Sequence, residues 1–283
     1  TALLLEIPAG RNKFQPKTNS KPRILMKKQF IHILLPLLFI SCEIDNYDAP
    51  NGGLFGRIID SETGESVPQA VPSDFGLRLR FYEADREHSL EQHFYAQTDG
   101  SFRNSRIFNC PIRLVLEQRN FLPVDTLNIS INGQTQCDIS VVPYLRFRIE
   151  DVATDERMIT IRFSVSRSDN ASFKHCKIMG CNLLWNASPQ IDNQSVNYAG
   201  KVLYTDAPAD TPDQQLLADA YSMELDLSKA GNRTKLEQLA HLIRANDNRI
   251  YLRLCASTKE TVGNDSAYYY NYSEIIPVQI HIE

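Results

Sequence analysis

Apolar and polar residues alternate in short stretches through the first half of the chain. The alternation has period two in Leu77–Tyr82 and in Leu145–Ile149, which is typical of strands that bury one face. Asp99-Gly100 and Asn132-Gly133 are turn signals between such stretches. The other strands predicted in this half are Leu54–Ile59, His93–Gln97, Ile112–Gln118, Val124–Ile131 and Cys137–Val142. Closely spaced strands with turns between them predict an all-β sandwich or barrel.

The second half continues the β pattern and adds helical segments. Asn232–Ile243 has apolar residues at the spacing of one helix face, which predicts a helix. A shorter helix is expected at Gln214–Ala220, inside the polar stretch 205–220. Pro143 cannot donate to a strand ladder and marks the expected boundary between two domains. The later predicted strands are Met158–Ser166, Cys176–Asn186, Tyr221–Leu227, Ile250–Ala256 and Ile275–Ile282.

The N-terminal region has the order of features of a lipoprotein signal peptide. Met26 is followed by the basic pair Lys27-Lys28 and then by the apolar run Phe30–Ile40, which is shorter than the ~20 residues of a membrane span. Ser41-Cys42 closes the run and resembles a lipobox. We expect cleavage before Cys42 and its acylation, which would anchor the chain in the lipid bilayer. The alternatives are a plain signal peptide or a core strand that this cysteine follows.

These patterns divide the chain into five segments. Residues 1–25 precede Met26, and we expect them to be translated upstream sequence that the natural protein lacks. The other expected segments are the signal peptide 26–41, a tether 42–52, a first β-sandwich 53–143 and a second β-sandwich 144–283. The acidic residues after Cys42 resemble the surface-export signals of lipoproteins from gut anaerobes related to Bacteroides. We therefore expect a lipid-anchored protein of the outer membrane that faces the cell surface.

The net charge excludes one class of partner. The whole chain has a formal net charge of −4. Residues 1–25 contribute +4 and residues 26–41 contribute +2, so the expected mature chain carries −10. Binding to nucleic acid depends on Lys and Arg at phosphates, and we expect none here. With Cys42 lipidated, five of the six cysteines remain, so at least one cannot pair within the chain.

The sequence contains no catalytic motif. It lacks the His-Glu-x-x-His zinc motif, the phosphate-binding glycine loop, the Gly-x-Ser-x-Gly elbow and the Rossmann fingerprint. A pair of carboxylates for glycoside hydrolysis stays open, because its spacing in the fold decides it. His88 and His93, with two glutamates nearby, suggest a metal site, but a solvated loop explains them better. We therefore expect a non-enzyme without metal or cofactor.

Aromatic residues are the candidates for a binding site. Sugars lay their apolar ring faces on aromatic planes, and amides or carboxylates bind their hydroxyl groups. The competing interpretation, which we favour for each residue taken alone, is packing in the sandwich core or in cross-strand pairs. The carbohydrate-binding candidates are Trp185, Tyr198, Tyr204, Tyr268 and Tyr270.

Several short motifs together resemble the domain-of-unknown-function family three-eight-two-three. In chain order they are Tyr47–Asn51, Gly56–Asp60, Thr63–Glu65, Thr98–Asn104, Phe121–Thr126, Val142–Arg146 and Tyr270–Glu274. The resemblance is good from about Tyr47 to Phe147 and weaker afterwards, and the polar insert around residues 205–245 departs from it. It implies a carboxypeptidase-regulatory or transthyretin-like sandwich followed by a fibronectin-III/Ig-like sandwich. It also implies a genomic setting beside SusC/SusD-like outer-membrane glycan importers.

Two functions from different classes follow from these features. The leading hypothesis is a non-catalytic lipoprotein that assists glycan binding or uptake beside a SusC/SusD-like importer. The alternative is a structural or interaction subunit that docks on an outer-membrane complex through a sheet edge or an apolar patch, without binding glycan. Hydrolase activity is a third hypothesis.

Overall fold

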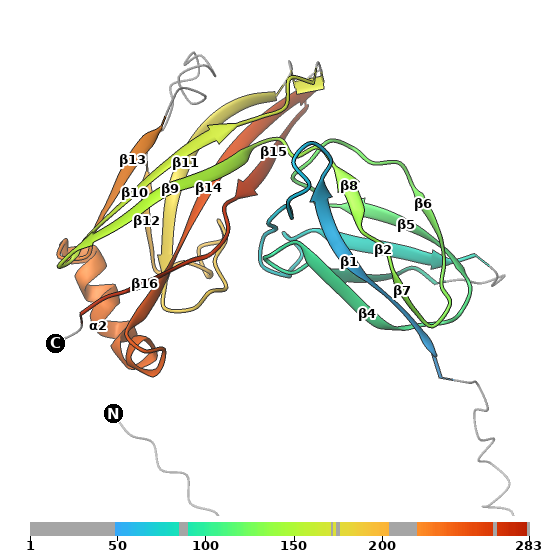
Figure 1. Ribbon diagram of the computed structural model, residues 1–283, viewed down its shortest axis with the longest axis horizontal. Helices are drawn as coiled ribbons and strands as arrows, with labels where there is room; N and C mark the ends of the chain where they lie inside the picture. Colours follow the sequence, from blue (N-terminus) through green and yellow to red (C-terminus); the bar gives the residue numbers. More distant parts are fainter. Residues whose placement is uncertain are drawn as a thin grey trace, which may run out of the picture. The chain divides into compact units, whose positions relative to one another are not determined.

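The strands of the chain assemble into two β-sandwiches in tandem (Figure 1). The structure is a computed structural model, and it describes residues 49–84, 90–170, 172–173, 176–203, 220–262 and 265–281. Cys42, Tyr204 and His88 lie outside the described residues, as do the expected signal peptide and nearly all of the helix expected at Gln214–Ala220. The all-β fold with two tandem sandwiches and one described helix confirms the predicted fold class.

The first sandwich has two four-stranded sheets. One sheet is built around β1 (Gly52–Asp60), which pairs antiparallel with β4 (Ser101–Ile107) and parallel with β7 (Gln134–Gln136) and β8 (Ile139–Val141). The other sheet has the order β3 (Gln92–Tyr95), β2 (Arg78–Glu83), β5 (Pro111–Glu117) and β6 (Leu127–Ser130). Apolar side chains of both sheets meet in one buried core that includes Leu54, Ile58, Phe81, Phe102 and Leu114.

The second sandwich has the strand arrangement of a fibronectin-III-like domain. Its three-stranded sheet has the order β13 (Tyr221–Asp226), β10 (Met158–Ser166) and β9 (Arg146–Asp155). Its larger sheet has the order β12 (Gly200–Leu203), β11 (Cys176–Asn186), β14 (Arg249–Val262) and β15 (Asp265–Tyr272), and β16 (Ile276–Gln279) also pairs with β14. Counted along the chain, the first, second and fifth strands form one sheet and the third, fourth, sixth, seventh and eighth form the other.

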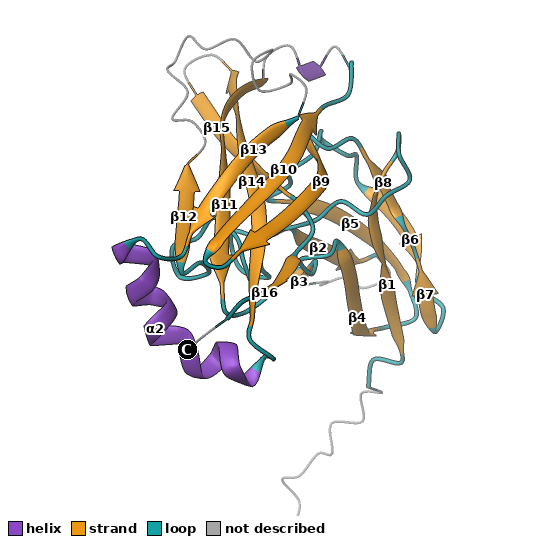
Figure 2. Ribbon diagram, turned by 60° about the vertical axis from the view of Figure 1, so that its left-hand side comes forward, coloured by secondary structure: helices purple, strands orange, loops and turns teal. Residues whose placement is uncertain are grey.

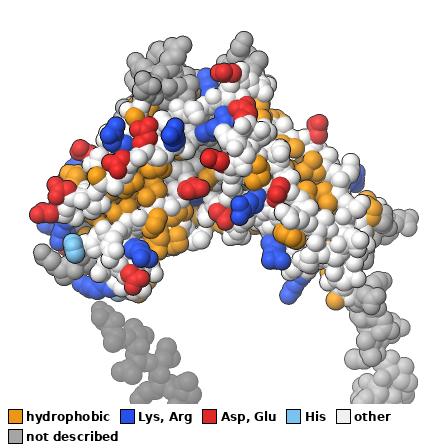
Figure 3. Space-filling view, viewed as in Figure 1, with side chains coloured by type: hydrophobic (Ala, Val, Ile, Leu, Met, Phe, Trp, Pro, Cys, Tyr) orange, Lys and Arg blue, Asp and Glu red, His pale blue; other side chains and the backbone are white. Residues whose placement is uncertain are grey.

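The helix α2 (Ala230–Ala245) lies between β13 and β14 in the chain and beside β12 in the fold (Figure 2). Its buried residues are Leu236 and Ile243, which pack against the core of the second sandwich. The spacing of seven residues, two helical turns, places them on one face, as the sequence pattern predicts. No helix in the described part of the chain has both the length and the apolar character needed to cross a membrane. Basic and acidic side chains are interspersed on the face drawn in Figure 3.

Hydrogen bonds and ion pairs join the two sandwiches. Arg146, at the start of β9, forms an ion pair with the buried Asp60 at the end of β1 and a second one with Glu62 at 2.8 Å. The Asn271 side-chain amide donates to the Asn120 carbonyl at 2.9 Å. These contacts link residues that are 84 to 151 positions apart in the chain. The junction is therefore a specific polar interface.

Arg253, in the first half of β14, is a fully buried part of this junction. Its side chain is 0 % exposed, and its guanidinium group lies over the ring of Tyr272 at 4.5 Å. It donates to four carbonyl oxygens, those of Ser273 (3.0 Å), Ile191 (2.6 Å), Gln69 (2.8 Å) and Thr98 (2.9 Å). The last two belong to the first sandwich. Burial lowers the pKa of Arg253 to about 10, which still leaves the group charged at neutral pH.

The ion pair at the junction predicts a dependence of stability on pH. Burial raises the pKa of the Asp60 carboxyl, but hydrogen bonds from Arg146 and from the Glu62 amide outweigh burial, so its pKa lies below the ordinary value. A carboxyl with a lowered pKa stabilises the fold above its unfolded pKa of about 3.9, and that contribution is lost as the pH falls through the lower folded pKa. We expect the difference in unfolding free energy between wild type and Asp60→Asn to be constant from about pH 5 to 7 and to shrink below about pH 4. Urea unfolding across this range measures it, and parallel pH profiles for the two proteins would contradict it.

Candidate functional site

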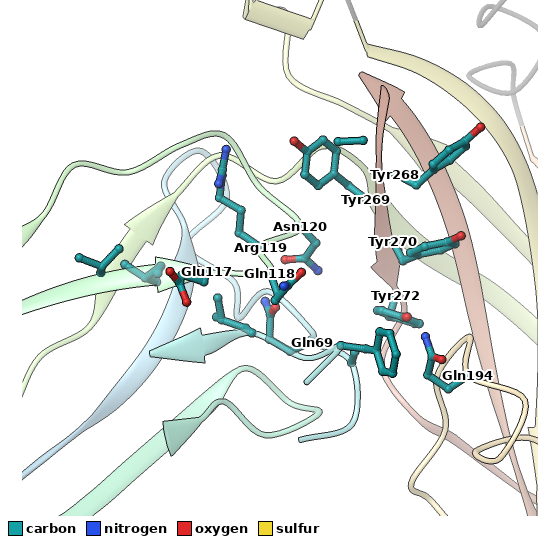
Figure 4. Close-up of a pocket in the computed structure, with 16 residues that line it drawn as sticks. Gln69, Glu117, Gln118, Arg119, Asn120, Gln194, Tyr268, Tyr269, Tyr270 and Tyr272 are labelled. Carbon is teal, nitrogen blue, oxygen red and sulfur yellow. The ribbon is translucent and has the colours of Figure 1, made fainter. Parts of the chain in front are cut away.

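Strand β15 carries four tyrosines whose side chains leave the strand on alternate sides. Tyr268, Tyr270 and Tyr272 project to one side, and Tyr269 projects to the other (Figure 4). β15 is an edge strand of its sheet, so its outer edge has no strand partner among the described residues. The tyrosines therefore stand at an open edge of the second sandwich.

A cleft of about 630 Å³ lies along this edge, between the two sandwiches. The second sandwich lines it with β15 and with Gln194, and the first sandwich with the segment 69–77 and the end of β5. Tyr268 is 51 % exposed and Phe75 is 66 % exposed. These are the only aromatic residues among the large apolar side chains that are exposed in the described ranges. Each sandwich thus contributes one exposed aromatic side chain to the same cleft.

Polar side chains complete the lining of the cleft. The amides are Gln69, Gln118, Asn120 and Gln194, and the charged groups are Glu117 and Arg119 (Figure 4). Flat aromatic faces beside amides and carboxylates suit a ligand that is apolar on its ring faces and rich in hydroxyl groups at its edges. The composition of the cleft therefore fits a sugar better than a fully apolar ligand.

The loop that follows β5 has an uncommon backbone conformation. β5 ends at Glu117, and the next residue, Gln118, has a φ of 55°. A left-handed backbone at a residue with a side chain costs about 1 kcal/mol or more, and such residues cluster at binding sites. The strained residue lies directly between the two charged residues of the cleft.

The hydroxyl groups of Tyr269 and Tyr270 are held in the neutral form. Burial raises the pKa of Tyr270 above its ordinary value. Burial, together with the hydrogen bond that Tyr269 donates to Glu260 at 2.8 Å, raises the pKa of Tyr269. Tyr269 also stacks on Tyr144, with ring centroids 4.5 Å apart and an interplanar angle of 11°. These side chains offer neutral hydroxyl groups and flat rings at physiological pH.

A family match covers the sandwich that forms one side of the cleft. Residues 52–142 match the model for the N-terminal domain of a family described as "Protein of unknown function (DUF3823)". The first sandwich is therefore similar to the N-terminal domain of the DUF3823 family. No curated protein sequence matches the chain.

Solved structures of DUF3823 proteins have the same fold as this chain. One is a DUF3823 family protein from Bacteroides uniformis ATCC 8492, with 18 % identity and a TM-score of 0.60, and another is from Parabacteroides merdae ATCC 43184, with 17 % and 0.61. A third, described as a "putative carbohydrate binding protein" from Bacteroides uniformis ATCC 8492, has 19 % identity and a TM-score of 0.61. Each match covers 82 % of this chain and 100 % of the other chain, which is more than the DUF3823 domain alone can supply. The likeness therefore extends into the second sandwich, and at these identities it shows the fold.

Two of the predicted sugar-binding residues come together in the cleft beside the DUF3823 domain. Tyr268 and Tyr270 both line it. Tyr198 does not, because it packs, partly buried, against a small apolar cluster that contains Leu184 and Ile191. Tyr204, like the lipidation candidate Cys42, lies outside the described residues.

Trp185 was wrongly included among the surface candidates. It is 0 % exposed and belongs to the main core of the second sandwich, and its Nε1 donates to the side-chain oxygen of Asn232 at 3.3 Å. A ring buried on all sides cannot stack on a sugar. The competing interpretation, a core tryptophan on a sandwich strand, is the one that the structure supports.

Other residues of the cleft were not anticipated from the sequence. Phe75, Gln118 and Arg119 come from the DUF3823 domain, and Gln194 comes from the connection between β11 and β12. Only Phe75 has a local signal, because it is a single aromatic residue in the turn-rich run Pro72–Gly76. Among the described residues, no cluster of three or more His, Cys, Asp or Glu side chains could hold a metal ion.

Proposed function

We propose that this chain is a non-catalytic surface lipoprotein that binds glycan in the cleft beside β15. The observation that carries the proposal is the pair of exposed aromatic residues, Phe75 and Tyr268, which line one cleft from two different sandwiches. Isolated exposed apolar residues are common and need no explanation, but two exposed aromatic rings beside the accessible amides of Gln118 and Gln194 form a surface suited to sugars. The similarity to a structure described as a carbohydrate binding protein supports the same function.

The proposed location follows from the N-terminal sequence. Acylation at Cys42 would anchor the chain in the outer membrane, with the acidic tether between the lipid and the first sandwich. A cell-surface position beside a SusC/SusD-like importer would let the cleft deliver glycan to that importer. The intact mass of the cellular product tests the anchor, because a diacylated, cleaved chain differs from an uncleaved one.

Replacement of Tyr268 should weaken glycan binding without unfolding the protein. The side chain is half exposed, and Lys259 Nζ lies 5.7 Å from the centre of its ring. We expect Tyr268→Ala to lower affinity about tenfold, equivalent to ~1.4 kcal/mol of lost contact, and to change unfolding free energy by less than about 0.5 kcal/mol. A glycan array followed by titration calorimetry on the purified full chain measures the first effect, and urea unfolding measures the second.

Tyr82 provides the matched control. It lies on β2 outside the cleft, where its hydroxyl donates to Glu91 at 2.7 Å. Tyr82→Ala should leave affinity for the same glycan unchanged. If both variants lose the same affinity, or if neither variant changes the affinity, the glycan binds outside the cleft.

The free edge of β15 favours the alternative function, a docking subunit that binds no glycan. An edge strand presents unpaired backbone groups to which another protein can add a strand. Under that alternative the full chain binds no glycan on the array, yet it co-purifies with an outer-membrane complex and loses that partner when Ala267→Pro blocks the edge. Glycan binding that depends on Tyr268 contradicts the docking-only function.

A further inference from the structure

One charged side chain in the cleft has no partner in the part of the chain that the structure describes. Arg119 lines the cleft just after β5, and it forms no ion pair or hydrogen bond with any described residue. Its Nε is buried without an acceptor. The other charged residue of the lining, Glu117, is compensated, because Arg80 Nη2 lies 2.8 Å from one of its oxygens and Arg78 Nη1 lies 4.0 Å from the other. The cleft therefore contains one uncompensated positive charge.

The stacked rings of Tyr269 and Tyr144 lie near this charge. Arg119 and Tyr269 project toward the same part of the cleft, and Tyr269 stacks on Tyr144 (Figure 4). Burial dominates and raises the pKa of both hydroxyls, while the positive charge of Arg119 acts in the opposite direction on each, which places it near the pair. Glu260 accepts the hydrogen bond of Tyr269 and makes no ion pair with Arg119. Rings of low polarity strengthen the attraction between a cation and an incoming anion.

We propose that the glycan bound in this cleft contains an acidic sugar and that Arg119 binds the carboxylate of that sugar. The proposal rests on the proposed glycan-binding function. A guanidinium group is a planar fork whose parallel N–H donors match the two oxygens of a carboxylate. A uronic acid combines such a carboxylate with a pyranose ring, so one residue can contact Arg119 while its neighbour in the glycan stacks on Tyr268. The exposed side-chain amide of Gln118 precedes Arg119 in the chain and lines the same cleft, where it can bind a hydroxyl group.

Because the protein as a whole is acidic, the contribution of Arg119 to binding of an acidic glycan can be separated from long-range electrostatic attraction. The chain is acidic, with a net charge of −4, and on the face drawn in Figure 3 basic side chains are interspersed with acidic ones. Long-range attraction therefore does not favour a polyanion. Recognition of an acidic glycan would depend on one local ion pair, and loss of that pair should remove the preference for the charged sugar while leaving the stacking contacts.

The test compares matched charged and uncharged ligands. Oligosaccharides of galacturonate, glucuronate and mannuronate are titrated into the purified full chain by calorimetry, each beside its methyl ester, which has the same ring but no charge. We expect at least one acid to bind about tenfold more tightly than its ester. Arg119→Gln should reduce the affinity for the acid to that for the ester and leave the ester unaffected. Arg113→Gln is the matched control, because Arg113 lies on β5, the strand that precedes Arg119, and its side chain is outside the cleft and over the ring of Tyr82.

The outcomes separate this proposal from the proposed function. Tyr268→Ala should lower the affinity for the acid and for the ester by the same factor, because stacking does not depend on charge. If wild type binds acid and ester equally, or binds neutral glycans alone, and Arg119→Gln changes nothing, the acidic ligand is excluded while glycan binding stands. Binding of sulfated glycans in preference to every uronate would also contradict the proposal that Arg119 binds a carboxylate. The absence of binding to any glycan refutes both proposals. Thermal unfolding of Arg119→Gln near that of wild type confirms that a loss of affinity is not a loss of fold.

Discussion

Arg253→Ala should lower the free energy of unfolding by about 3–5 kcal/mol, the cost typical of removing one partner from a buried charged network. The substitution leaves four carbonyl oxygens, from Ser273, Ile191, Gln69 and Thr98, without their donor. A buried polar group left unsatisfied costs about 1–3 kcal/mol, and partial relaxation keeps the total below the sum of four. Urea unfolding followed by circular dichroism measures the change.

The conservative variant and a surface control sharpen this result. Arg253→Lys keeps the charge but offers three donors where four carbonyls need them, so its stability should fall between wild type and Arg253→Ala. Arg249→Ala removes an arginine from the same strand, where it is 48 % exposed and lies 4.0 Å from Asp247, and it should cost less than about 1 kcal/mol. If Arg253→Ala is as stable as Arg249→Ala, the four hydrogen bonds do not hold the sandwiches together.

The strands that could be predicted from the sequence are those whose own side chains are divided between a buried and an exposed face. β10 was predicted with its observed bounds, and its burial alternates along most of its length. β4 was missed because, in Ser101–Ile107, only Phe102 and Ile107 are buried. β15 was also missed, because Asp265–Tyr272 lacks an alternation of apolar and polar residues. Both of these strands are defined by hydrogen bonding to another strand. β4 pairs with β1, which lies much earlier in the chain, and β15 pairs with the preceding strand, β14; neither pairing is visible in the apolar–polar pattern of the strand itself.

The candidate site could be predicted only in part, for a related reason. Tyr268 and Tyr270 stand out by composition alone, whereas Phe75 and Arg119 join them only through the packing of one sandwich against the other. Trp185 was misplaced because both faces of its strand are covered. Leu183, Leu184 and Trp185 are all 0 % exposed, since Ile191 and the residues around it cover the face opposite the main core. A strand that is buried on both faces does not alternate between apolar and polar residues. Its sequence pattern therefore cannot show whether a given side chain, such as that of Trp185, faces solvent or the core.

Trp185→Ala should reduce stability far more than it affects the cleft. Replacing a fully buried tryptophan by alanine costs about 3–5 kcal/mol, through lost burial and the cavity that remains. The indole also fills a space made by Gly200, where a Cβ atom would lie 2.0 Å from Nε1, and its N–H reaches Asn232 at the start of α2. The loss should therefore destabilise the contact between β11, β12 and the helix. Because Trp185 is the only tryptophan, unfolding of the variant is followed by circular dichroism.

The same residue also provides a spectroscopic test in the wild-type protein. A buried indole should emit at short wavelength, resist quenching by iodide, and keep its emission when glycan fills the cleft, since Trp185 does not line it. Trp185→Phe, which retains an aromatic ring but loses the N–H, should lose less stability than Trp185→Ala and should bind glycan with wild-type affinity. If instead the alanine variant is as stable as wild type and has lost its glycan affinity, or if glycan shifts the emission and protects it from iodide, Trp185 is a binding platform and its assignment to the core is wrong.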